Sequence, residues 1–327
     1  SDGLRIHYKV NKENLLPKEN SKQTLYQPVL KMLINRLSTA NRLIKIGSAR
    51  LLATQSQQTD NVSPIVYEKL TGLDKGIALY GLNSPKERNA LSFGLTEAMR
   101  EVNQLIREDT KISVVILHSM VPGIFCAGAN LKERFKMNED EVANFVRYLR
   151  GTLIEVEDLP VPTIAAVEGV AVGGGLELAL ACDIRIAAET AKIGLVETSR
   201  GLIPGAGGTQ RLPRTVNLNI AKELIYTSRI ISGKEAKELG IANHVVPQNS
   251  SNNAALQKAL ELAREITINA PIALRCAKQA INEGIQLGLK EGYEVEQKYY
   301  ERNIPTKDRQ EGMISFMEKR KPIYEGH

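Results

Sequence analysis

Two glutamates set among apolar residues are the side chains of this sequence with the clearest potential for chemistry. Glu177 lies between Leu176 and Leu178, and Glu197 follows a short run that ends in Val196. An apolar setting raises the pKa of a carboxyl group, which lets the group exchange a proton near neutral pH. Each glutamate also has a simpler explanation, as a charge at a helix N-terminus or as an exposed loop residue. Together they are candidates for a general acid and a general base.

A glycine-rich turn precedes the first of these glutamates. Three successive glycines, residues 173–175, follow an apolar run and open the predicted helix that carries Glu177. The first N–H groups of a helix lack internal partners, and glycine allows a ligand to approach them closely. The spacing matches neither a dinucleotide fingerprint nor a phosphate loop. The turn therefore either binds a developing oxyanion or needs glycine only for packing, and the spacing leaves both explanations open.

Two further loops contain glycine-rich segments. Residues 123–130 follow the apolar run 112–117 and could supply a second N–H group, so that two donors would converge as an oxyanion hole. Residues 204–211 resemble another helix start. We expect this last segment to support Glu197 and not to touch substrate.

Hydrophobic periodicity predicts the elements that position these loops. Strands are predicted at residues 65–70, 76–82, 112–117, 162–167, 184–188 and 192–194. Helices are predicted at residues 92–107, 139–156, 173–182, 220–226, 233–239, 253–268, 271–283 and 307–319. Strand–strand–helix units recur in the first two thirds of the chain. This order predicts an α/β fold with a helical C-terminal region.

The positive charge of the chain is concentrated at its start. The 327 residues carry a formal net charge of +6, yet residues 1–59 hold ten basic and three acidic residues, which leaves −1 for the remainder. No acid occurs in residues 20–59, where basic residues alternate with serine, threonine and leucine. This composition is typical of a mitochondrial transit peptide, with an unstructured basic tail as the alternative. We predict a leader at residues 1–60, with Met32 as the expected start, a core at 62–265 and a C-terminal helical region at 266–327.

Other classes of function find little support in the composition. Cys126, Cys182 and Cys276 are isolated and lack metal-binding spacing, so we expect reduced thiols and no metal site. No apolar run approaches the roughly 18 residues that a membrane span needs. The core is nearly neutral and the sequence has no tryptophan, so we expect no nucleic-acid surface.

Taken together, these segments resemble the crotonase (enoyl-CoA hydratase/isomerase) superfamily over residues 65–325. The resemblance rests on residues 164–169 with the glycines at 173–175, and on residues 180–184, 125–129, 205–212 and 311–320. It implies a spiral of β-β-α units and C-terminal helices that join subunits into trimers, commonly paired into hexamers. The greatest similarity is to mitochondrial branches of the family.

The resemblance also implies roles for individual residues. Glu177 and Glu197 would be the acid–base pair, and the N–H groups of Ala129 and Gly174 would form the oxyanion hole. Coenzyme A contacts are implied for Lys86, Arg88 and Ala90 on the adenine side, and for Phe316 and Lys319 from the last helix, often of a neighbouring subunit. Coenzyme A would be part of the substrate, so no separate cofactor is expected. Asn130 departs from the family pattern, which usually has Asp there.

Retention of both glutamates favours hydration, because many relatives with other activities lack one of them. The implied reaction is reversible syn addition of water to a 2-enoyl-CoA in mitochondrial fatty-acid or branched-chain amino-acid breakdown. The alternatives are double-bond isomerisation, hydration of methylglutaconyl-CoA, and RNA binding on the same fold. RNA-binding relatives carry spaced lysines where this chain has Phe93, Glu97 and Glu101, so RNA is not an expected partner. Residues 135–154 and the C-terminal helices are expected to line the acyl end of the pocket.

Overall fold

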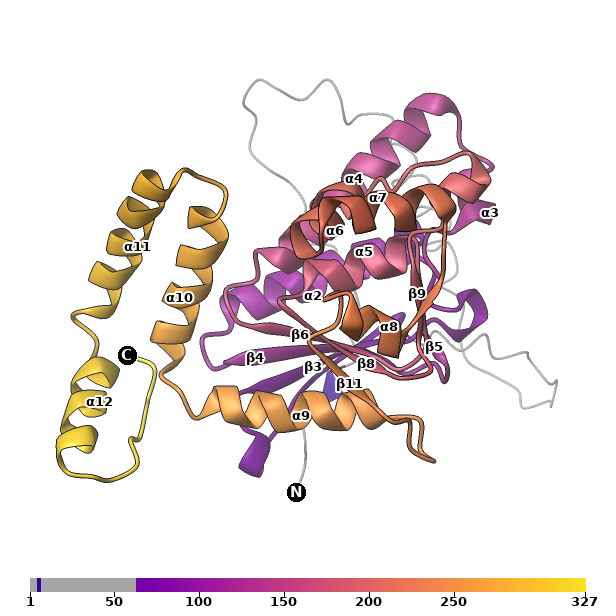
Figure 1. Ribbon diagram of the computed structural model, residues 1–327. Helices are drawn as coiled ribbons and strands as arrows, with labels where there is room; N and C mark the ends of the chain where they lie inside the picture. Colours follow the sequence, from indigo (N-terminus) through magenta and orange to yellow (C-terminus); the bar gives the residue numbers. More distant parts are fainter. Residues whose placement is uncertain (1–4, 7–62) are drawn as a thin grey trace, which may run out of the picture. The chain divides into compact units, whose positions relative to one another are not determined.

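The computed structural model describes residues 5–6 and 63–327 (Figure 1). The predicted leader therefore lies outside the described residues, apart from the two-residue strand β1 (Arg5–Ile6), which pairs with β2 (Ile65–Lys69). None of the described helices is long and apolar enough to cross a lipid bilayer.

The larger of the two sheets in the described chain runs in the order β1-β2-β3-β4-β6-β8-β11. Strands β2 and β3 (Ile77–Leu82) form an antiparallel hairpin joined through η3 (Gly72–Asp74). In the order of the sheet, the strands after β3 run parallel to it. These strands are β4 (Val114–Ser119), β6 (Thr163–Val167), β8 (Ile184–Ala188) and β11 (His244–Val246). Strand β6 is buried throughout, as a parallel strand covered on both faces should be.

A smaller sheet is built from the short strands that follow the long ones. Its order is β10-β9-β7-β5, and its members are β5 (Ile124–Cys126), β7 (Val170–Val172), β9 (Lys192–Gly194) and β10 (Ile231–Ser232). Strand β5 follows β4, β7 follows β6, and β9 follows β8. Helices follow each pair, namely α3 (Leu131–Arg134) with α4 (Glu139–Glu157), α5 (Gly174–Ala181), and α6 (Gly208–Thr215) with α7 (Leu218–Thr227). This repetition confirms the predicted spiral of β-β-α units.

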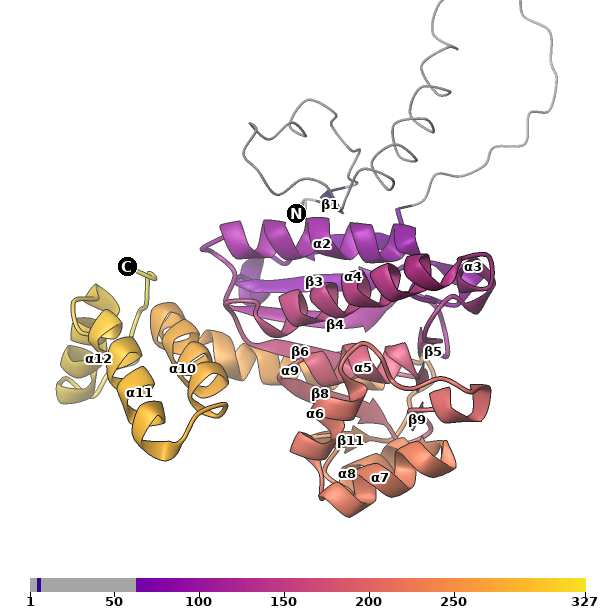
Figure 2. The same cartoon turned by 90° about the horizontal axis from the view of Figure 1, so that it is seen from above.

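Helices cover both faces of the larger sheet, as Figures 1 and 2 show. On one face, α2 (Phe93–Glu108), α4 and α5 contribute Met99, Leu149 and Leu178 to the main buried cluster. On the other face lies α9 (Ala254–Thr267), whose alanines at 255, 259 and 263 pack against strands β3, β4, β6 and β8. Alanine at every fourth position lets the helix lie close to the sheet.

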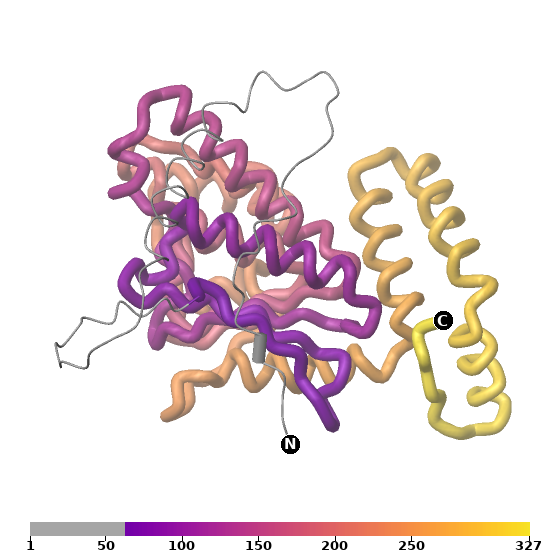
Figure 3. The backbone as a smooth tube through the Cα atoms, turned by 180° about the vertical axis from the view of Figure 1, so that it is seen from behind, coloured from indigo at the N-terminus to yellow at the C-terminus, as the bar shows by residue number. Residues whose placement is uncertain are grey.

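The C-terminal region consists of α10 (Pro271–Gly284), α11 (Leu289–Asn303) and α12 (Lys307–Met317), which follow α9 at the yellow end of the tube in Figure 3. Helix α10 packs against α11. The buried ammonium of Lys278 joins α10 to the core, because it donates to Asp183 at 2.8 Å and to the carbonyl oxygen of Val161 at 3.0 Å.

The structure differs from the predicted elements in a few places. Strand β4 begins two residues later than predicted, because the N–H groups of Ser113 and Val114 both donate to the carbonyl of Gly76 in the preceding turn. Strands β5, β7, β10 and β11 were not predicted, because each has only two or three residues, and of the strands this short only β9 was predicted. Helices α3 and α11 were also missed, whereas α8 (Gly233–Glu238) agrees with its predicted range within one residue.

Candidate active site

The turn between β7 and α5 brings Glu197 against the start of the helix that carries Glu177. Gly173 has φ 54° and ψ −126°, a conformation that glycine adopts far more readily than other residues. Its N–H donates to the carbonyl oxygen of Gly194 at 2.8 Å, which ties the turn to β9. A Cβ atom at Gly173 would lie 3.2 Å from Oε1 of Glu197. This glycine is therefore required by the backbone and by the close approach of the carboxylate.

Two backbone N–H groups lie side by side next to this turn. A Cβ atom at Gly174 would be 3.6 Å from the amide nitrogen of Ala129, and one at Gly128 would be 3.4 Å from the amide nitrogen of Gly174. Within residues 63–327, neither Ala129 nor Gly174 donates its N–H to another residue. Gly128 has φ +88°, and a Cβ atom there would meet the carbonyl oxygen of Val172 at 2.7 Å. Two neighbouring free donors are what an oxyanion hole requires.

The segment before α2 holds the second of these loops in place. The N–H of Leu91 donates to the carbonyl of Gly128 at 2.7 Å, and the N–H of Asn130 donates to the carbonyl of Leu91 at 3.3 Å. The buried side chain of Asn89 donates to the carbonyl of Phe125 at 3.0 Å. The position of the Ala129 amide therefore depends on residues 89–91.

The residues predicted to contact coenzyme A fall on two separate segments. Lys86 and Arg88 are exposed in or just after η4 (Pro85–Glu87), and Ala90 is buried beside them. The residues that follow this segment hydrogen-bond through their backbone to residues 123–130, the loop that supplies the Ala129 amide and is called the oxyanion loop below. Phe316 and Lys319 are exposed at the end of α12 and just after it. No hydrogen bond or ion pair joins α12 to residues 84–130 within the described chain.

Glu177 is buried to 2% exposure and clamped by two backbone donors. Its Oε1 accepts the N–H groups of Ala206 at 2.8 Å and of Gly208 at 2.7 Å. Burial raises the pKa of Glu177, and the two N–H donors partly offset this increase by stabilising the ionised form. The expectation that residues 204–211 support Glu197 is wrong, because these hydrogen bonds go to Glu177.

Glu197 begins η5 (Glu197–Arg200) and has a different environment. Burial, followed by the nearby charge of Glu177, raises the pKa of Glu197 to about 7. Its Oε2 is buried and has no hydrogen-bond partner among the described residues. The two carboxylates therefore lie close enough to interact, and Glu177 alone is clamped by two backbone N–H groups of another loop.

Two arginines near the carboxylates were missed by the sequence analysis. Arg211 binds Glu157 at 2.6 Å and the carbonyl of Ala206 at 3.0 Å, so it braces the loop that holds Glu177. Arg134 ends α3, one helical turn after the oxyanion loop, and the charges of both glutamates act on it. A basic residue one turn beyond a glycine-rich loop is a weak signal by itself, since most arginines are simply solvated.

No group of three or more His, Cys, Asp or Glu residues in the described part of the chain could hold a metal ion. The chemistry that the site can perform with its own groups is proton transfer by two carboxylates beside two free N–H donors.

Comparison with known proteins identifies the class to which this arrangement belongs. A family model described as enoyl-CoA hydratase/isomerase matches residues 72–327. The chain belongs to this family, as the resemblance in its motifs predicted, and its substrates are acyl-CoA thioesters. It is a hydro-lyase of the enoyl-CoA hydratase type by family and by its relatives.

Individual members of the family are similar to this chain over most of its length. The chain is 51% identical over 253 residues to the mitochondrial methylglutaconyl-CoA hydratase of Homo sapiens, covering 77% of this chain and 75% of the relative. It is 51% identical over 271 residues to the mitochondrial enoyl-CoA hydratase domain-containing protein 2 of Mus musculus, covering 83% and 92%. The crystal structure of an enoyl-CoA hydratase from Bacillus anthracis matches with a TM-score of 0.76 at 48% identity, covering 81% of this chain and 100% of that one. These matches confirm the predicted fold class.

Proposed function

We propose that the chain catalyses the reversible syn addition of water to a 2-enoyl-CoA thioester, with Glu177 and Glu197 as the acid–base pair. The observation that carries the proposal is the unequal environment of the two carboxylates. Glu177 accepts two backbone N–H groups, whereas Glu197 has a pKa of about 7 and a buried oxygen without a partner. One proton shared by such a pair resides on Glu197 near neutral pH.

In the proposed reaction, the thioester carbonyl oxygen accepts hydrogen bonds from the N–H groups of Ala129 and Gly174. These donors draw electrons toward the oxygen, which makes C3 of the enoyl group electrophilic. Glu177 takes a proton from water while the water oxygen bonds to C3, and the resulting enolate takes a proton from Glu197 at C2. The product gains one water, and the proton has moved from Glu197 to Glu177. Exchange with solvent restores the starting state.

Substrate binding in this proposal uses both segments predicted to contact coenzyme A. Lys86, Arg88 and Ala90 bind the adenine side, next to the loop that carries Ala129. Phe316 and Lys319 come from α12 of a neighbouring subunit, which is consistent with their exposure in a single chain. Substitution of Lys86 and Arg88 by alanine is expected to raise KM more than it lowers kcat.

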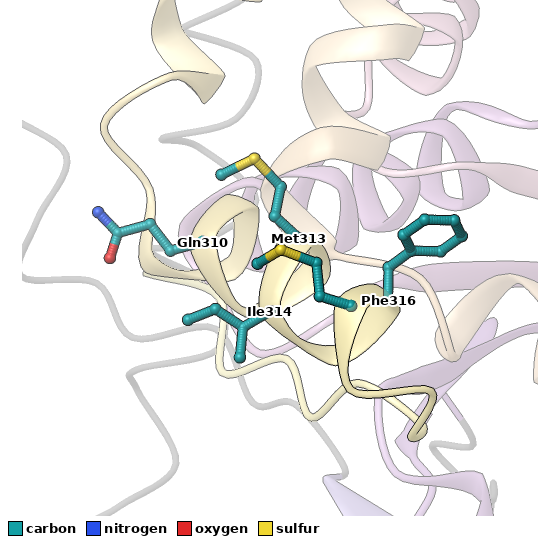
Figure 4. Close-up of a pocket in the computed structure, with 5 residues that line it drawn as sticks. Gln310, Met313, Ile314 and Phe316 are labelled. Carbon is teal, nitrogen blue, oxygen red and sulfur yellow. The ribbon is translucent and has the colours of Figure 1, made fainter.

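The proposed assembly is a homotrimer or a hexamer formed through the C-terminal helices. A shallow apolar pocket on α12, shown in Figure 4, is lined by Gln310, Met313, Ile314, Phe316 and Met317. Phe316 is 84% exposed and Met317 is 72% exposed, which is unusual for a surface that faces only water. The mass of the protein by light scattering should be three or six times that of one chain, and a stable monomer would contradict this assembly.

The proposal extends to the mitochondrial matrix and to fatty-acid or branched-chain amino-acid breakdown. The names of two relatives place them in mitochondria, and the acid-free basic composition of residues 20–59 supports the same compartment. Methylglutaconyl-CoA hydration is the second candidate reaction, because one of these relatives bears that name.

The direct test is to incubate the protein with crotonyl-CoA in heavy water. The expected product carries a hydroxyl group at C3 and one deuterium at C2, both added to the same face of the double bond. Movement of the double bond without water uptake would indicate isomerisation instead. Absence of any hydration across a panel of enoyl-CoA thioesters would refute the proposal.

A further inference from the structure

Lys319 has a backbone conformation that is rare for its residue type, with φ 56° just after α12 ends at Met317. Its N–H donates to the carbonyl oxygen of Phe316 at 3.3 Å. The N–H of the next residue, Arg320, donates to the carbonyl oxygen of Ser315 at 3.0 Å. These two hydrogen bonds form a Schellman motif, in which the left-handed position is usually glycine. A lysine there is strained, and such strain persists only where the surrounding structure holds the residue in place.

The side chain of Arg320 holds this turn through three hydrogen bonds to carboxylates. Its Nη1 and Nη2 atoms donate to Oε1 and Oε2 of Glu311 at 2.5 and 2.8 Å, so this ion pair is bidentate. Its Nε atom donates to Oε2 of Glu318 at 2.7 Å. Exposed ion pairs are weak when they stand alone, but a planar guanidinium shared by two carboxylates has a fixed orientation.

The chain beyond this turn is attached to the start of α12 as well. The N–H of Ile323 donates to Oε1 of Glu311 at 2.8 Å. One helical turn earlier, the buried carboxylate of Asp308 accepts the N–H groups of Glu325 at 2.8 Å and Gly326 at 2.9 Å. The chain after α12 is therefore tied back to the helix at two points, which limits the movement of the turn at its end. We call this attachment the C-terminal clasp.

The ammonium of Lys319 has no partner in the clasp. The side chain is exposed, and within residues 63–327 its ammonium forms no hydrogen bond or ion pair. If this position served only to end the helix, glycine would form the same turn without strain. The strained backbone therefore keeps an unpaired cation at a fixed place on the surface, beside Phe316.

We propose that Arg320 and Glu311 are positioning residues for the substrate, because they hold Lys319 in the conformation in which its ammonium binds a phosphate of coenzyme A. The inference rests on the proposed function, in which Lys319 contacts coenzyme A. A lysine binds phosphate as a point charge, so its position determines the strength of the contact. The guanidinium of Arg320 is already occupied by two carboxylates, and it acts on the substrate through Lys319.

Hydration of two thioesters by the full chain tests this role. Crotonyl-CoA carries the phosphorylated nucleotide, whereas crotonyl-pantetheine has the same thioester arm without it. Arg320→Met should raise the KM for crotonyl-CoA about 10-fold, the loss of one hydrogen bond to a charged group, and leave kcat unchanged. The KM for crotonyl-pantetheine should stay within about 2-fold of wild type, because that substrate has no phosphate for the lysine.

Further variants separate positioning from a merely structural role. Lys319→Gly removes the ammonium and the strain, and it should raise the KM for crotonyl-CoA as much as Arg320→Met does. The double variant should show no further increase, because both changes remove one contact. Arg320→Lys keeps the charge but not the paired donors, so its KM should be intermediate. The matched control is Lys298→Met, which removes an exposed ion pair of α11 and should leave both KM values unchanged.

The inference is overturned if Arg320→Met leaves the KM for crotonyl-CoA unchanged, raises both KM values equally, or multiplies the effect of Lys319→Gly. Glu311→Gln gives the same comparison if Arg320→Met does not fold. Failure of the proposed function would look different, because wild type would not hydrate crotonyl-CoA. Calorimetric titration with coenzyme A then decides the inference. Binding about 10-fold weaker in Arg320→Met than in wild type supports it, and equal binding overturns it.

Discussion

At the residue scale, the chemistry depends on two identical side chains with different surroundings. Glu177 is held by the N–H groups of Ala206 and Gly208, while Glu197 is half-buried beside it and its Oε2 has no hydrogen-bond partner among the described residues. Environment alone can thus divide the roles of acid and base between two glutamates. The active form is the one in which the pair holds a single proton. Hydration and dehydration require the same total number of protons, so the two directions should share one pH profile.

The alkaline side of that profile is the first prediction. Because the pKa of Glu197 is about 7, the pair loses its proton as pH rises through that value. The kcat/KM for crotonyl-CoA should therefore decline above about pH 7. Initial rates at low substrate concentration across a pH series measure this decline. A constant kcat/KM up to about pH 9 would exclude Glu197 as the proton donor.

The same shift predicts a pH-dependent effect on stability. The pKa of Glu197 is raised from 4.5 to about 7 on folding, so the folded chain binds more protons than the unfolded chain between these values. Its contribution to stability is fully present below the unfolded pKa and is lost as pH rises through about 7. Glu197→Gln cannot ionise, so its Tm relative to wild type should increase from about pH 5 to about pH 8. A Tm difference that does not vary with pH would contradict burial of this carboxyl group.

At the element scale, two turns and one short helix bring the site together. The turn at Gly173 lets Glu197 approach the start of α5, the loop before α3 supplies the Ala129 amide, and the N-terminal region of α6 clamps Glu177. The turn at Gly173 follows β7, and the loop with Ala129 follows β5. The pairing of these two strands in the smaller sheet therefore fixes the distance between the turn and the loop.

Gly173→Ala tests the turn as an element. The added Cβ would lie 3.2 Å from Oε1 of Glu197, in a backbone conformation that alanine rarely adopts. Displacing the carboxylate by about 1 Å should lower kcat about 100-fold. Gly151→Ala in α4 is the matched control, because its Cβ would meet open space. That control should keep full activity and gain about 0.5–1 kcal/mol of stability; equal activity of both variants would refute the role of the turn.

Long periodic elements could be predicted from the sequence, and the contacts between loops could not. The apolar stripe of α2 and its Ser92 cap were predictable because helix periodicity and capping are local. The partner of residues 204–211 was assigned incorrectly, because proximity to Glu197 in sequence does not determine which carboxylate the loop faces. Arg134 was missed for a similar reason, since its proximity to both glutamates depends on how the loops fold together.

At the scale of the whole molecule, α10 is joined to the core by the ion pair of the buried Lys278 and by hydrogen bonds from Arg275 to the carbonyl oxygens of Asp109 and Ile112. Lys278 on α10 is 5% exposed in its side chain and bonds Asp183, which also accepts the N–H and hydroxyl of Thr163. The predicted assembly and the predicted coenzyme A contacts of Phe316 and Lys319 both require these helices in place. The leader prediction, by contrast, concerns residues that lie outside the described chain apart from residues 5–6, and it stays a prediction.

Lys278→Ala should therefore destabilise the protein strongly. Removing one partner leaves the Asp183 carboxylate without its buried cation, which costs about 3 kcal/mol. Lys298→Ala is the matched control, because its ion pair with Glu283 is exposed on both sides and should be worth less than about 1 kcal/mol. Denaturant unfolding measures both free energies, and equal losses would show that Lys278 does not anchor α10.

The central claim is that two carboxylates act on one water molecule, and the rate of crotonyl-CoA hydration by glutamine variants tests it most directly. Glu177→Gln and Glu197→Gln keep size and burial but remove the exchangeable proton. Each should lower kcat by about 100- to 10,000-fold, and the double variant should lose much less than the product of the two. Hydration at the wild-type rate by either single variant would contradict the account.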